Sequence, residues 1–135
     1  MKPALVLLTL LLTFQCSLGQ SRSQNTRQSL EVAAAVAPEW PKGDVPVGKQ
    51  EVQVVITTDG YFGNVIAAEA KGPTSVFSEP CEIAARLWKF SPSKPNSRQT
   101  LTFVFEVFAK TNRTRKAMTT FIPPYKVMIE RPENE

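Results

Sequence analysis

The sequence predicts a small α+β domain in which an antiparallel sheet packs one main helix on one face. The chain has 135 residues, a length that suits one domain. Residues 51–58 and 101–109 alternate apolar and polar side chains, a pattern typical of half-buried strands. Between them, residues 78–90 repeat apolar side chains at helical spacing.

The first hairpin is predicted from alternation and from a turn signal. Val52, Val54 and Ile56 occupy alternate positions in a segment rich in β-branched residues. Asp59-Gly60 follows directly, and this dipeptide favours a tight hairpin turn. Residues 64–70 should therefore return as an antiparallel strand.

The helix is predicted from Ser78 or Glu79 to about Phe90. Its apolar face contains Cys81, Ala84, Leu87 and Trp88. Pro92 disfavours helical geometry just before it, which ends the helix. The segment 91–97 is then a loop that leads into the strand at 101–109.

The C-terminal third is predicted as a charged turn at 110–116 and a final pair of short strands, 118–122 and 125–130, separated by Pro123-Pro124. Residues 30–37 are apolar and could form either a strand or one helical turn. Much of the core should come from seven apolar residues. These are Val52, Val54, Ile56, Leu101, Phe103, Phe105 and Trp88.

The N-terminus has the features of a cleavable signal peptide at 1–19. Lys2 precedes an apolar run at 4–12, and small residues precede Gln20. Lipidation of Cys16 is the alternative to simple cleavage. We expect a flexible leader at 20–29, the domain with its C-terminal strands at 30–131, and a tail at 132–135. The mature protein should be periplasmic or secreted, without a membrane span.

Composition argues against an enzyme. The chain has no His, which excludes Ser-His and Cys-His nucleophile pairs. Residues 43–49 match the start of a phosphate-binding loop, but the next residue is Gln50 and a strand follows. Ser91 and Lys94 have a spacing used by some acyl enzymes, yet they lie in a proline-broken loop. We expect no cofactor and no metal, and a net charge of +4 does not indicate a nucleic-acid partner.

Several segments, taken in order, resemble the TonB C-terminal-like domain family. Residues 36–41 (VAPEWP) resemble its entry motif, and 51–68 resemble its first hairpin. Residues 84–90 (AARLWKF) with Pro92 resemble its helix, which carries Ala-Ala and ends in Trp-basic-Phe-x-Pro. The chain is similar to a small secreted variant, because it lacks a membrane anchor and a long proline-rich spacer.

The resemblance implies a binding module in envelope transport that adds a strand to a segment of an outer-membrane transporter. The implied edge strand is 100–109, and the tail beyond Met118 either covers it or leaves it free. The alternative is a structural or regulatory envelope protein that self-associates through the same edge, without a role in energy transduction. The candidate edge residues are Thr100, Thr102, Val104, Glu106 and Phe108. A possible electrostatic contact with the partner comes from Lys110, Arg113, Arg115 and Lys116.

Overall fold

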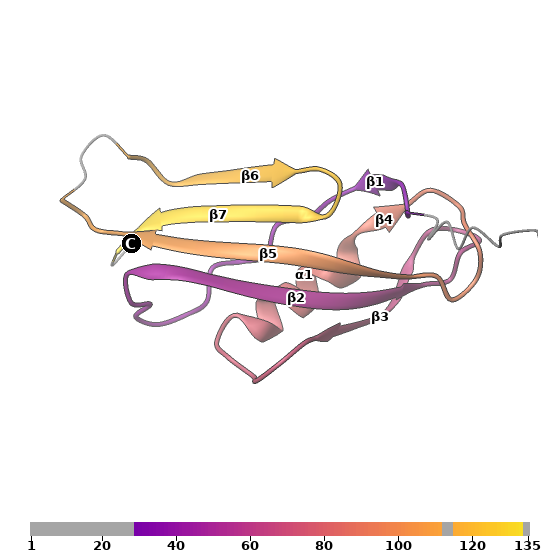
Figure 1. Ribbon diagram of the computed structural model, residues 1–135, viewed down its shortest axis with the longest axis horizontal. Coiled ribbons are helices and arrows are strands. Elements are labelled where there is room, and N and C mark those ends of the chain that lie inside the picture. Colours follow the sequence, from indigo (N-terminus) through magenta and orange to yellow (C-terminus); the bar gives the residue numbers. More distant parts are fainter. Residues whose placement is uncertain (1–28, 112–114, 134–135) are drawn as a thin grey trace, which may run out of the picture.

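The computed structural model describes residues 29–111 and 115–133. Its helix and strands follow one another along the chain as Figure 1 shows. In order they are β1 (Val32–Ala34), β2 (Gly48–Thr58), β3 (Val65–Ala70), α1 (Ser78–Leu87), β4 (Lys89–Phe90), β5 (Arg98–Phe108), β6 (Met118–Ile122) and β7 (Lys126–Pro132).

The main sheet has five strands in the order β3-β2-β5-β7-β6, and β1 pairs with β4 in a separate small sheet. Neighbouring strands of the main sheet are antiparallel except β5 and β7, which are parallel. The predicted fold class is therefore wrong: the structure is a sheet-rich fold with 45% strand and 10% helix, and its main sheet is mixed. The difference arises because the last strand inserts beside β5 and because α1 has only ten residues.

The core forms where rows of apolar side chains cross the sheet. Val52 pairs with Phe103, which also pairs with Val127 of β7. Because paired residues point to the same face, all three side chains lie on the face covered by α1. We call this the helix-side face. The seven predicted core residues are all buried, whereas Val127 and Ile129 are core residues that the sequence did not single out.

The helix ends at Leu87, three residues before the predicted end. Trp88 takes an extended conformation, with ψ of 149°, so the chain leaves the helix there and continues into β4. The Trp88 ring is buried, and its Nε1 donates a hydrogen bond to the Val36 carbonyl over 2.8 Å. This bond joins the segment after β1 to the end of the helix.

The predicted β2–β3 hairpin is confirmed by antiparallel pairing. The Asp59 carboxylate accepts hydrogen bonds from the backbone N–H groups of Phe62 and Asn64, which stabilises the turn. Gly63 has a φ of 68°, and a Cβ at this position would lie 1.7 Å from the Phe90 carbonyl oxygen. Glycine is thus required where the turn meets β4.

The final pair of strands is also confirmed, as antiparallel β6 and β7. The predicted signal peptide, Cys16 and all but the last residue of the predicted leader lie outside the described residues. Within the described part of the chain, no helix is long and apolar enough to cross a membrane.

Candidate partner-binding surface

The predicted binding strand is not an edge of the sheet. The strand β5 lies between β2 and β7 and is hydrogen-bonded to both. Thr102, for example, pairs with Gln53 on one side and Lys126 on the other. From Thr102 to Val107, β5 therefore has a ladder partner on both sides, whereas Thr100 pairs with Val55 of β2 alone. The candidate edge residues Thr100, Thr102, Val104, Glu106 and Phe108 all lie on this internal strand.

β5 is internal because the C-terminal segment from Met118 onward adds two strands to the sheet beside it. The second of these strands, β7, occupies the side of β5 away from β2, and the first, β6, becomes the outer edge (Figure 1). The sheet thus ends in β3 on one side and β6 on the other. Strand addition requires free backbone N–H and C=O groups, so these two outer strands are the first candidates in the main sheet.

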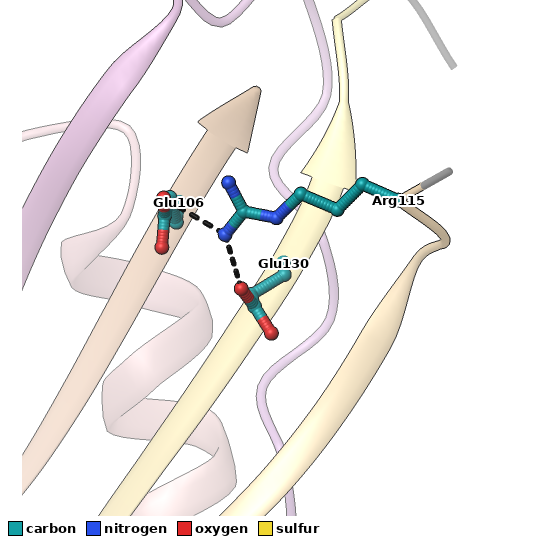
Figure 2. A network of polar contacts seen from close by, with 3 residues as sticks. All are labelled: Glu106, Arg115 and Glu130. Carbon is teal, nitrogen blue, oxygen red and sulfur yellow. Dashed lines mark hydrogen bonds and ion pairs between the residues drawn. The ribbon is translucent and has the colours of Figure 1, made fainter. Parts of the chain in front are cut away.

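Lys110, Arg113, Arg115 and Lys116, here called the basic cluster, were predicted to contact a partner. Arg115 instead pairs with carboxylates of the same chain. The Arg115 guanidinium contacts the carboxylates of Glu106 on β5 and Glu130 on β7, as Figure 2 shows. Its Nη2 lies 2.9 Å from Glu106 Oε1, and its Cζ lies 4.7 Å from the centre of the Phe108 ring. Hydrogen bonds to Glu130 and Glu106 raise the pKa of Arg115. This side chain therefore serves an internal contact.

The rest of that cluster is placed differently. Lys110 and Lys116 are exposed on either side of the turn before β6. Arg113 lies outside the described residues. The two exposed lysines can still attract an acidic partner toward the start of β6.

The edge strand β6 lacks the charged residues and prolines that usually keep other strands from pairing with an edge. Its sequence, MTTFI, has no charge, no proline and three β-branched residues. Met118, Phe121 and Ile122 are exposed by 55%, 46% and 39%, although each is a large apolar residue. Natural edges are usually blunted by charge, proline or a cover. In the described part of the chain, the hydrogen bonds of β6 backbone groups are those of its ladder with β7.

The opposite edge, β3, is protected. The Ala70 N–H donates a hydrogen bond of 2.9 Å to Glu82 Oε1 on α1. The strand also contains Glu69, a charge within its sequence VIAAEA. A pairing strand would have to compete with the helix side chain and face this charge, so β6 is the better candidate edge.

A cleft of about 630 Å³ adjoins the C-terminal half of β6. Its walls come from the segment that leads into β1 and from the β6–β7 hairpin, and its lining is mainly apolar. The Tyr125 hydroxyl donates a hydrogen bond of 2.6 Å to the Leu30 carbonyl, which joins the two walls. Burial raises the pKa of Tyr125, so this donor remains protonated at neutral pH.

Cys81 is the one cysteine among the described residues, and it is buried on α1. Burial raises the pKa of its thiol to about 12, with a smaller contribution from the charge of Glu82. A thiolate nucleophile is scarcely populated at neutral pH under these conditions. The position of Cys81 agrees with the predicted packing role on the helix.

The chain was compared with protein-family models, curated proteins and solved structures, and none of them matches. The features of the surface described above are thus the basis for a functional interpretation.

Proposed function

We propose that this chain is an exported, non-catalytic binding module that recognises an extended peptide by pairing it with β6. The observation that carries the proposal is the uncharged edge with three exposed apolar side chains. Export is inferred from the sequence at 1–19. The absence of His and the buried Cys81 thiol support a role without nucleophilic chemistry.

The length of β6 sets the scale of the interaction. Five residues at about 3.4 Å each span about 17 Å, which is enough for a short ladder. Each backbone hydrogen bond contributes about 0.5–1.5 kcal/mol net, and ordering the peptide opposes binding. Burial of the exposed apolar side chains supplies the rest. We therefore expect micromolar affinity, which a titration to high micromolar concentration would cover.

The family resemblance suggests that the natural partner is a segment of an outer-membrane transporter. The proposal itself does not depend on that family, because it rests on the edge strand. A partner segment should be extended, and acidic residues at its ends would be attracted by Lys116 and Lys126 near the two ends of β6.

Self-association through the same edge is the second candidate, and one observation favours it. An antiparallel pair of β6 strands centred on Thr120 would place Met118 opposite Ile122 of the second copy. Two threonines would face each other at the centre, which is a favourable cross-strand pair. The strand has no charge to oppose this arrangement.

The test measures fluorescence anisotropy with the full mature chain and a synthetic labelled peptide, Glu-Thr-Thr-Thr-Leu-Thr-Thr-Thr-Glu. Backbone N-methylation removes donors from the peptide without changing the protein. Because alternate residues of a strand direct their N–H groups toward the ladder, methylation of one alternating set should abolish binding. Methylation of the other set should leave most of the affinity.

A charge on the edge provides the test from the side of the protein. Thr120→Lys should weaken peptide binding strongly, because a cation at the centre of β6 opposes apolar pairing. Ile66→Lys, an exposed site on the opposite edge strand, is the matched control and should bind like wild type. Circular dichroism checks that both variants are folded.

Three outcomes would overturn peptide recognition at this edge: no binding to the parent peptide, equal binding of the two alternately methylated peptides, or equal effects of the two lysine substitutions. Sedimentation of the same samples distinguishes the alternative. A dimer that Thr120→Lys dissociates, with no peptide binding, would support self-association instead.

A further inference from the structure

The cleft beside β6 suggests which peptides the edge would select, an inference that rests on the proposed function. Most of its lining is apolar and includes Leu30, Val32, Ala35, Phe121 and Ile122, and the charged residues Glu31 and Lys126 also line it. Phe121 and Ile122 belong both to the cleft and to the candidate pairing edge. A peptide paired with β6 would therefore lie beside the cleft at the C-terminal end of the strand.

The direction of Phe121 decides which peptide side chain can enter. Phe121 pairs with Val127, whose side chain is buried on the helix-side face. Phe121 consequently points to that face, where the segment around β1 lies. In an added strand, the residue directly opposite Phe121 points to the same face. Its side chain would be directed toward the cleft.

The cleft walls are held in place without a ligand. The Tyr125 hydroxyl, just before β7, donates a hydrogen bond to the Leu30 carbonyl. The Ser91 N–H donates a hydrogen bond of 2.8 Å to the Glu31 carbonyl. The Thr102 N–H of β5 donates to the Tyr125 carbonyl over 2.9 Å. A preformed apolar cleft binds a side chain without first being ordered, which favours affinity.

We propose that this cleft takes one large aliphatic or aromatic side chain of the bound peptide, at the position opposite Phe121. The volume of about 630 Å³ is more than one large side chain needs, so such a side chain can enter without displacing the walls. Apolar walls favour an apolar occupant, and the Tyr125 hydroxyl is already engaged with Leu30. The substrate class is thus an extended peptide with one apolar anchor, and alternation leaves its neighbouring residues free to be polar.

The test varies the anchor in the peptide Glu-Thr-Thr-Thr-X-Thr-Thr-Thr-Glu, in which X is Leu, Phe, Ala or Asp. The threonines offer no other large apolar side chain, so the register cannot shift to place a substitute in the cleft. Replacing Leu with Asp should weaken binding about ten- to hundredfold, the range expected for burial of one large apolar side chain. The affinity of the Ala peptide should lie between those of the Leu and Asp peptides. The Phe peptide should bind about as tightly as the Leu peptide.

Val32→Asp tests the cleft from the opposite wall. Val32 lines the cleft, whereas its neighbour Ala33 is exposed and lies outside the lining, so Ala33→Asp is the matched control. We expect Val32→Asp to lower affinity for the Leu peptide about tenfold or more. It should reduce the preference for Leu over Ala, and Ala33→Asp should change neither quantity.

The outcomes separate this inference from the proposed function. If all four peptides bind equally and N-methylation still abolishes binding, the cleft is not the anchor site, although strand addition stands. If no peptide binds at all, both proposals are wrong. If Val32→Asp does not fold, the peptide series still decides the question, because it uses only the wild-type chain.

Discussion

Removal of the Trp88 side chain should strongly destabilise this domain. The ring is 1% exposed and lies against Phe90 and Phe103, with ring centres 6.1 and 6.2 Å away. Its Nε1 is the hydrogen-bond donor to the Val36 carbonyl. The residue therefore joins three parts of the fold: the end of α1, the centre of β5 and the N-terminal segment.

The magnitude follows from two contributions. Trp88→Ala creates a cavity in the core, and such changes cost about 3–5 kcal/mol. Trp88→Phe keeps most of the packing but leaves the Val36 carbonyl without its donor, which costs about 1–3 kcal/mol. Because whole domains are stable by about 5–15 kcal/mol, Trp88→Ala removes a large part of the total.

Urea denaturation followed by far-ultraviolet circular dichroism measures both variants. With an m value of about 1.5–2 kcal/mol/M, a loss of about 4 kcal/mol lowers the midpoint by about 2–3 M. Trp88→Phe should give a smaller shift in the same direction. Trp40 remains in both variants, so its fluorescence provides a second probe of the same transition.

Tyr61→Ala is the matched control, because Tyr61 is 79% exposed at the hairpin tip. It should change the free energy of unfolding by no more than about 0.5 kcal/mol. The reasoning would be refuted if Trp88→Ala shifted the midpoint as little as this control. Equal shifts for Trp88→Phe and the control would refute the role given to the bond with Val36.

Three further predictions concern the ion pairs of Arg115 and the buried Cys81 thiol. Arg115→Ala leaves the carboxylates of Glu106 and Glu130 side by side, so the melting temperature should fall, and the gap to wild type should shrink in 1 M NaCl. Equal melting temperatures at low salt would contradict this. The Cys81 thiol should react with a disulfide reagent at pH 8 only after denaturation. Since its folded pKa, about 12, exceeds its ordinary value of 9.0, the unfolded state ionises first, and the Cys81 contribution to stability should decline as pH rises from 9 toward 12.

Local patterns predicted much of the secondary structure. Alternation in β2 and β5 and the Asp59-Gly60 turn correctly indicated the hairpin and the long central strand. The expected pair of strands after the charged turn is present as β6 and β7, which pair antiparallel. These features depend on neighbours within a few residues, which is the range over which side-chain periodicity and turn chemistry act.

The position of β5 in the sheet depends on a contact that local patterns do not specify. A parallel neighbour joins β5 only after the chain turns twice, so neither alternation nor turn signals reveal it. One signal was present in the sequence. Val104 and Phe108 are buried on the opposite face from Phe103 and Phe105, and a strand that is apolar on both faces is typical of a sheet interior.

The parallel pairing of β5 with β7 also brings two carboxylates together, and Arg115 offsets their repulsion. The pairing places Glu106 directly beside Glu130, and like charges opposite one another destabilise a sheet. Arg115 contacts both carboxylates and lies three residues before β6 begins. The contact that neutralises the pair therefore also fixes the chain where it enters the candidate binding edge. Deletion of 118–135 would remove Val127 and Ile129 from the core as well as this edge. Such a truncation should unfold the domain, because it exposes the side of β5 that β7 covers.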